Sequence, residues 1–141
     1  MADQSLKSAV RLLVRRLDEL GRVTDEPGKL TRTFLSPAMS RANALVGQWM
    51  RAAGLTTRVD PTGNLIGRRE AKTPGAKTLL LGSHLDTVRD AGKYDGILGV
   101  LTAIECVAAF HKNGERPPFA IEVIAFGDEE GVRFPSTLTG S

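Results

Sequence analysis

The sequence predicts an α/β fold with a mixed, largely parallel sheet flanked by helices. Two segments with helical periodicity precede a pair of short strand-like segments. A long apolar segment then separates two further strands, and a strand, a helix and a strand in this order normally form a right-handed parallel crossover. At 141 residues the chain can bury one core, so we expect one domain or part of a larger one.

Two amphipathic helices are expected in the first third of the chain. Apolar residues recur at steps of three and four over residues 6–20, and Gly21 follows as a stop. Ser36 and Pro37 form an N-cap and first-turn pair, and Gly54 ends the second helix. Both helices therefore present an apolar stripe to a core.

Loops and two short strands follow from the local composition. Residues 22–35 have no clear period and are expected to form a loop. Strands are expected at residues 56–59 and 65–68, joined by the turn-rich segment 60–64. Residues 72–77 contain Pro and Gly and are expected to form a surface loop.

The second half of the chain is expected to carry the functional edge. Residues 78–81 predict a buried strand that places His84 just past its end. Residues 97–110 are apolar on nearly all sides and predict a buried helix. The strand at residues 119–126 ends directly before the acidic segment 128–130. Open α/β sheets bind ligands beyond the carboxyl ends of their strands, so we expect both motifs at one site.

Composition excludes several classes of function. The formal charge is +3, but the 19 Lys and Arg residues are interleaved with 16 acids and form no basic stripe, so nucleic-acid binding is not expected. The single cysteine, Cys106, can form no internal disulfide, which favours a reducing, cytoplasmic location, and we expect it in the core. The apolar stretches are too short or too interrupted to predict a signal peptide or a membrane span.

His84 and Asp86 are candidates for a metal ligand and its supporting group. They are two residues apart, so an extended backbone would point both side chains to the same side. An imidazole can bind a metal through one nitrogen while the other donates to a carboxylate, which fixes the tautomer. The alternative is a solvated histidine beside a turn aspartate.

Acidic residues supply the remaining candidates. Asp95 precedes Gly96 at the start of the apolar helix, where it could cap the helix or bridge two metal ions. Asp128, Glu129 and Glu130 repel one another unless they splay into water or a cation neutralises them. In a metal site one such carboxylate can bind metal while its neighbour moves protons. A solvated acidic turn is the alternative.

Together these motifs resemble the hydantoinase/carbamoylase family of zinc-dependent amidases, relatives of aminoacylase and carboxypeptidase-type metallopeptidases. The resemblance extends over almost the whole chain. It rests on three blocks, residues 82–88, 92–100 and 128–134, and on N-terminal segments at residues 32–35, 49–55 and 60–67.

The resemblance implies a role for each candidate. It implies His84 as ligand of one metal ion, Asp95 as the bridging ligand and Glu130 as ligand of the second ion. It further implies Glu129 as general base and Asp86 as the group that orients His84. The cofactor would be two divalent ions, zinc or manganese with cobalt possible, holding a water or hydroxide that attacks an amide or ureido carbonyl.

The resemblance also implies a small ureido or carbamoyl substrate. Residues 87–96 and 130–135 look most like allantoate amidohydrolases, which release ammonia in purine degradation. N-carbamoyl-L-amino-acid hydrolase and a ureidoglycolate-type amidase are the alternatives.

Family members continue to two further histidine ligands, most substrate-binding residues and an inserted domain that mediates dimerisation. Residues 1–141 are therefore expected to be the N-terminal part of the catalytic domain of a homodimer. A second hypothesis is that the chain as given is catalytically silent and binds metal weakly.

Overall fold

The computed structural model of the protein describes residues 2–134 and 138–140. It contains seven elements: α1 (Ala2–Leu20), α2 (Pro37–Ala52), β1 (Thr56–Val59), β2 (Leu65–Arg69), β3 (Thr78–His84), α3 (Ile97–Lys112) and β4 (Ala120–Phe126). These confirm the two N-terminal helices, the short strand pair and the strand, helix and strand that follow. The segment between α1 and α2 is a loop, as expected.

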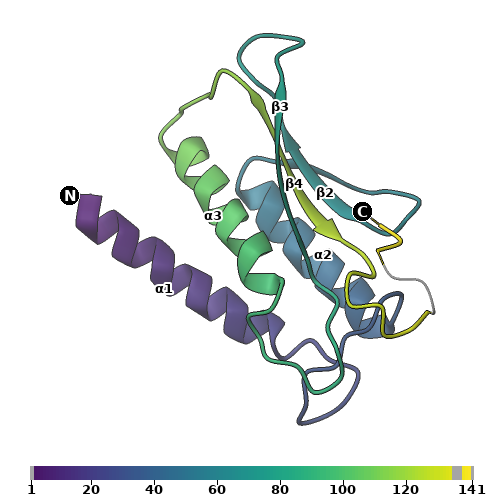
Figure 1. Ribbon diagram of the computed structural model, residues 1–141. Coiled ribbons are helices and arrows are strands. Elements are labelled where there is room, and N and C mark those ends of the chain that lie inside the picture. The colour runs from purple at the N-terminus through teal and green to yellow at the C-terminus, as the bar shows by residue number, and fades with distance from the viewer. Residues whose placement is uncertain (1, 135–137, 141) are drawn as a thin grey trace.

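The four strands form one mixed sheet in the order β1-β2-β4-β3. β3 and β4 pair in parallel, and α3 makes the connection between them (Figure 1). β1 pairs antiparallel with β2, and β2 pairs antiparallel with β4. The mixed α/β class is confirmed. The expected excess of parallel pairing is not found among the described strands, because a short turn folds β1 back on β2 and only one crossover follows.

The helices build a core against the sheet. α2 packs on β1 and β2, α3 packs on β3 and β4, and α1 packs on α3 (Figure 1). The core is continuous across helices and strands and includes Leu20, Val46, Met50, Leu65, Leu101, Ile104 and Val123. Among the described residues, no helix is both long and apolar enough to cross a membrane.

Local chemistry explains where α2 begins. The Ser36 hydroxyl accepts a hydrogen bond from the Met39 N–H at 3.1 Å, and Pro37 occupies the first helical position. Ser36 therefore accepts from an N–H group that has no partner within the helix. Pro37 lacks an N–H group, but at the first helical position such a group would have no partner in the helix, so no hydrogen bond is lost. Both predicted start signals are confirmed.

Two expectations about burial are wrong. β3 extends through His84 and lies at the edge of the sheet, so Leu79 and Leu80 are exposed. α3 is buried along one stripe only, and Cys106 is exposed on another face and does not lie in the core. An edge strand and an outer helix each have a side that the described residues do not cover, and composition alone could not reveal this.

Candidate metal centre

The predicted motifs meet at one edge of the sheet. His84 is the last residue of β3, and its register partner Phe126 is the last residue of β4. Because the two strands are parallel, the acidic turn that follows β4 begins beside His84. The expectation that both motifs share the carboxyl edge of the sheet is confirmed.

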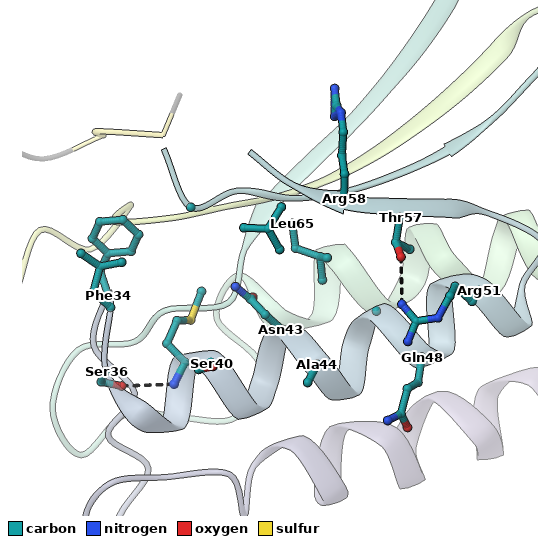
Figure 2. Close-up of a pocket in the computed structure, with 15 residues that line it drawn as sticks. Phe34, Ser36, Ser40, Asn43, Ala44, Gln48, Arg51, Thr57, Arg58 and Leu65 are labelled. Carbon is teal, nitrogen blue, oxygen red and sulfur yellow. Dashed lines mark hydrogen bonds between the residues drawn. The ribbon is translucent and has the colours of Figure 1, made fainter. Parts of the chain in front are cut away.

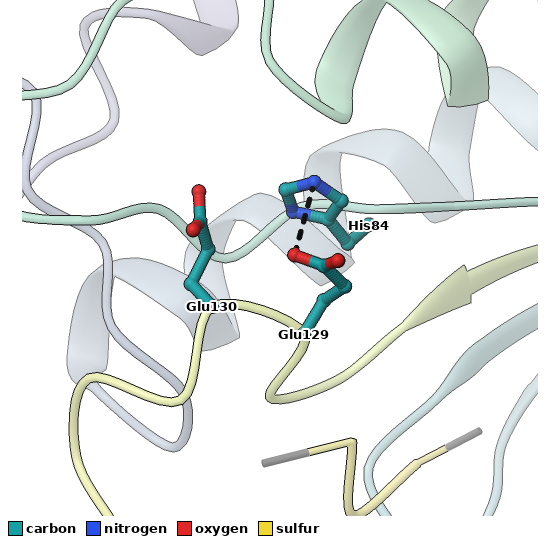
Figure 3. A group of neighbouring side chains, drawn as sticks. All are labelled: His84, Glu129 and Glu130. Atoms are coloured by element: carbon teal, nitrogen blue, oxygen red, sulfur yellow. Dashed lines mark ion pairs between the residues drawn. The ribbon is translucent and has the colours of Figure 1, made fainter.

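Three side chains form a compact donor cluster (Figure 3). One ligand atom from each of His84, Glu129 and Glu130 lies within 4.8 Å of those of the other two. The Nε2 atom of His84 is 3.6 Å from Oε2 of Glu129 and 3.7 Å from Oδ1 of Asp95. The structure therefore brings Asp95, Glu129 and Glu130 together beside the His84 imidazole.

The backbone of Asp86 fixes the orientation of the His84 ring. Nδ1 of His84 lies 3.0 Å from the Asp86 carbonyl oxygen. A carbonyl only accepts, so in the neutral ring this contact places the proton on Nδ1 and leaves the Nε2 lone pair directed at the acidic cluster. The ring is buried, and this hydrogen bond selects the tautomer that can bind a cation.

The Asp86 carboxylate joins the two motifs. Its Oδ1 atom is 3.5 Å from Nδ1 of His84, and its Oδ2 atom accepts the Glu130 N–H at 3.0 Å. The side chain is almost fully buried. Asp86 thus contacts the histidine through its carbonyl and ties the acidic turn to the end of β3 through its carboxylate.

The N-cap alternative for Asp95 is wrong. Gly96 occupies the N-cap of α3 with φ of 64°, and no side chain caps the helix there. The Asp95 side chain is exposed and turned toward His84. A Cβ on Gly96 would overlap the His84 ring, so glycine is required both by the backbone conformation and by the close approach.

Asp128 neither extends into solvent nor joins the donor cluster, unlike what was expected for the three acidic residues. It is fully buried and accepts a hydrogen bond from the Thr139 hydroxyl. Its φ is 59°, a conformation that a non-glycine residue rarely adopts. The turn thereby separates the three acids, with Asp128 inside and Glu129 and Glu130 at the cluster.

Electrostatics favour a cation at this cluster. Burial disfavours the His84 imidazolium, but hydrogen bonds to Asp86 and the charges of Asp86 and Glu129 outweigh burial and raise the pKa to about 9. Burial also raises the pKa of Glu130, opposed by His84 and reinforced by Asp95 and Glu129. Crowded carboxylates that resist ionisation gain from a positive charge in their midst.

The donor set fits a divalent transition metal. One imidazole nitrogen and several carboxylate oxygens suit zinc, manganese or cobalt. His84, Asp95 and Glu130 would hold such ions, since their donor atoms face the same space. The exposed Glu129 side chain remains open to solvent on the same side.

A groove elsewhere on the molecule is separate from this cluster. It has a volume of about 590 Å³ and runs between α2 and β1 (Figure 2). Arg51 crosses it and donates to the Thr57 hydroxyl at 2.8 Å. None of the five predicted site residues lines this groove, so it is separate from the donor cluster.

Fold and site together define an α/β chain that carries a metal-type donor cluster at the carboxyl edge of its sheet. The sequence model of peptidase family M28 matches residues 64–141, more than half of the chain. The chain therefore belongs to this family.

Individual relatives are more specific. Allantoate deiminase 1 of Glycine max is 53% identical over 91% of this chain and 27% of its own length. An N-carbamoyl-L-amino-acid amidohydrolase of Pseudomonas sp. (strain NS671) is 44% identical over 96% of this chain and 32% of its own length. The crystal structure of a hydantoinase/carbamoylase family amidase from Burkholderia ambifaria is 36% identical, with a TM-score of 0.87 over 94% of this chain and 32% of that chain.

These comparisons confirm the resemblance to hydantoinase/carbamoylase amidases. They also show that the chain spans only about a quarter to a third of the length of the relatives it matches. The metal ligands and the general base remain predictions, which the proximity of the side chains makes testable.

Sequence reasoning missed two residues that shape the site. In the sequence, Gly96 was noted only as the residue that follows Asp95. Its backbone conformation and its contact with His84 are both essential to the geometry of the site. Arg32 lies in an aperiodic loop and is completely buried. A single arginine in such a loop carries no pattern that predicts burial.

Proposed function

We propose that this chain supplies one side of a two-ion metal centre in a hydrolase of linear amide and ureido C–N bonds. The proposed ligands are His84, Asp95 and Glu130, with Asp95 shared between the ions. The observation that carries this proposal is the convergence of the His84, Glu129 and Glu130 donor atoms within 4.8 Å. Membership of peptidase family M28 supports it.

When bound, divalent ions polarise a carbonyl oxygen and lower the pKa of a bound water to about 7. The chain's own residues would direct the protons. Glu129 is exposed on the side of His84 Nε2, where its carboxylate can take a proton from water and return it to the leaving nitrogen. The new bond joins the water oxygen to the carbonyl carbon, and the C–N bond breaks. Asp86 keeps the His84 proton on Nδ1 throughout.

Allantoate is the proposed substrate, with ammonia released in purine degradation. The support is the higher identity to an allantoate deiminase, 53%, than to an N-carbamoyl-L-amino-acid amidohydrolase, 44%. N-carbamoyl-L-amino acids are the second candidate, because the second relative matches a larger share of the chain.

We further propose that residues 1–141 correspond to the N-terminal part of a di-metal catalytic domain, which acts as a homodimer at the length of its relatives. In the described residues His84 is the one imidazole at the cluster. Additional ligands would complete the centre, so the isolated chain is proposed to bind metal without turnover.

A chimera tests the division of labour between Glu129 and Glu130. This chain would replace the corresponding segment of soybean allantoate deiminase 1, and ammonia release from allantoate and from N-carbamoyl amino acids would be measured with zinc or manganese. Glu129→Gln is expected to lower the rate by about 10²- to 10⁴-fold because it removes a general base. It should leave zinc content unchanged, whereas Glu130→Gln is expected to lower zinc affinity as well.

The unmutated chimera is the control. Failure to release ammonia from either substrate would contradict the proposed activity. Activity retained in the Glu129→Gln chimera would instead contradict the assignment of Glu129 as the general base. It would not contradict the assignment of the metal ligands.

A further inference from the structure

Arg32 is a completely buried arginine that contacts Leu85, the residue after His84. Its Nε donates to the Leu85 carbonyl at 2.8 Å, and its Nη1 donates to the carbonyls of Leu20 and Val23, each at 2.9 Å. The Arg32 N–H also donates to the Thr87 hydroxyl at 2.9 Å, and the Thr87 N–H donates back to the Arg32 carbonyl at 2.9 Å. Arg32 therefore holds both neighbours of Asp86 in the chain.

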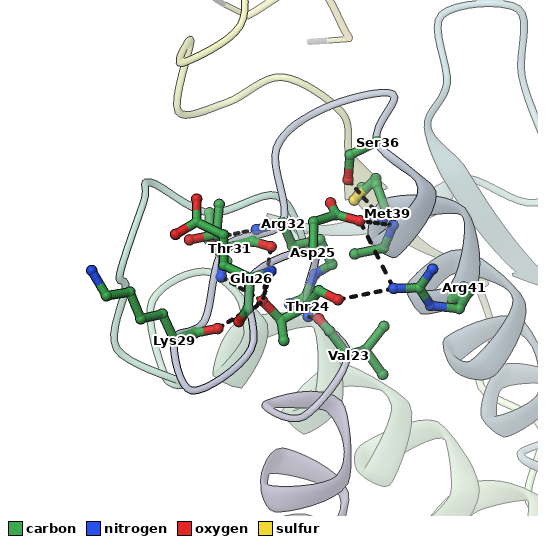
Figure 4. Close-up of polar contacts among 12 residues, drawn as sticks. Val23, Thr24, Asp25, Glu26, Lys29, Thr31, Arg32, Ser36, Met39 and Arg41 are labelled. Atoms are coloured by element: carbon green, nitrogen blue, oxygen red, sulfur yellow. Dashed lines mark hydrogen bonds and ion pairs between the residues drawn. The ribbon is translucent and has the colours of Figure 1, made fainter.

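The loop that presents Arg32 is fixed by its own polar contacts (Figure 4). The Thr24 hydroxyl accepts the N–H groups of Glu26 and Thr31 at 3.1 and 2.9 Å. The Asp25 carboxylate accepts the Ala38 N–H at 2.9 Å and ties the loop to the first turn of α2. Arg32 thus contacts the residue that follows β3 from a loop that is held in place by hydrogen bonds.

Charge links Arg32 to Asp86. Burial lowers the pKa of Arg32 to about 10, while the negative charges of Asp86 and Asp25 act in the opposite direction. At neutral pH the guanidinium is therefore charged. Nη2 of Arg32 and Oδ1 of Asp86 are both buried without a hydrogen-bond partner among the described residues.

The segment that Arg32 holds carries the key contacts of the centre. His84 precedes Leu85 and is oriented by the Asp86 carbonyl. The Asp86 carboxylate accepts the Glu130 N–H. A shift of Leu85 would therefore disturb the imidazole and the acidic turn at the same time.

We propose that Arg32 is a positioning residue for the metal centre, which clamps residues 85–87 so that His84 and Glu130 face a common ion. This inference rests on the proposed function, in which His84 and Glu130 are metal ligands. Arg32 would touch neither metal nor substrate and would act through the segment that carries Asp86.

Zinc affinity of the whole chain tests this role. Arg32→Met is expected to weaken zinc binding by about 10- to 100-fold, the usual effect of losing a group that supports metal ligands. Arg69→Met is the matched control, because Arg69 also donates to two main-chain carbonyls, of Glu115 at 2.7 Å and Val107 at 3.4 Å, away from the donor cluster. The zinc affinity of Arg69→Met, measured by calorimetry, is expected to equal that of the wild type.

A metal-free measurement separates positioning from general support. Hydrogen exchange of the Glu130 amide, whose acceptor is Asp86, is expected to accelerate in Arg32→Met relative to amides within β4. Arg69→Met is expected to leave the Glu130 amide unchanged. If Arg32→Met fails to fold, the same two measurements are made on Arg32→Lys. Lysine keeps the positive charge but lacks the planar guanidinium that donates to three carbonyls.

Wild-type zinc affinity together with wild-type Glu130 exchange in a folded Arg32 variant would overturn the proposal. If the wild-type chain binds no zinc at all, the proposed metal centre fails. The Glu130 exchange would then still decide whether Arg32 positions the acidic turn.

Discussion

Replacement of Gly96 with alanine is expected to weaken zinc binding by up to about 100-fold. A Cβ at this position would overlap several atoms of the His84 ring. The ring cannot move away without losing the hydrogen bond from Nδ1 to the Asp86 carbonyl. The φ of 64° adds about 1–2 kcal/mol of strain for any residue with a Cβ, so the free energy of unfolding should fall as well.

Gly92→Ala is the matched control for this substitution. Gly92 lies in the same connection between β3 and α3, and a Cβ there would meet no atom within 4 Å among the described residues. Its zinc affinity and melting temperature are expected to match those of the wild type. Wild-type zinc affinity in the Gly96→Ala chain would show that the close approach to His84 does not shape the site.

The metal-free chain is expected to lose stability as the pH rises from about 6.5 to 9. The pKa of His84 is raised from 6.5 to about 9 in the folded chain, because contacts with Asp86 and Glu129 outweigh burial. The imidazolium therefore stabilises the fold fully below pH 6.5, and this contribution disappears as the pH passes through 9. The shift corresponds to a loss on the order of 3 kcal/mol in the free energy of unfolding.

Urea denaturation at constant ionic strength, with a chelator present, measures this pH dependence. His84→Gln is expected to flatten the curve between pH 6.5 and 9, because glutamine does not titrate. Zinc affinity should rise over the same interval, since the metal requires the unprotonated imidazole. An equal pH slope in the wild type and in His84→Gln would exclude His84 as its source.

Much of the architecture was predictable because it follows from local rules. Ser36 and Pro37 indicate the start of α2. The turn-rich segment 60–64 between two short strand-like segments indicates the antiparallel pair of β1 and β2. The parallel pairing of β3 and β4 follows from the helix between them. This pairing is also why His84 and the acidic turn could be expected together.

Other features depend on contacts that local sequence does not encode. The exposure of Cys106 depends on what packs against α3. The burial of Arg32 depends on three carbonyl groups from two separate segments of the chain, residues 20–23 and Leu85. Asp128 looks identical to its acidic neighbours in sequence. Only the turn after β4 directs it inward toward Thr139 and leaves Glu129 and Glu130 at the cluster.

The two histidines of the chain allow a direct test of the proposed metal centre. His84 lies beside the N-terminus of α3, whereas His111 lies in its last turn and is exposed. With 1.5 Å of rise per residue, the helix separates them by roughly 20 Å. Calorimetric titration of zinc into the wild type, His84→Ala and His111→Ala therefore compares a proposed ligand with a remote imidazole. We expect His84→Ala to abolish zinc binding and His111→Ala to retain wild-type affinity; equal binding by His84→Ala and the wild type would contradict a metal centre built on His84.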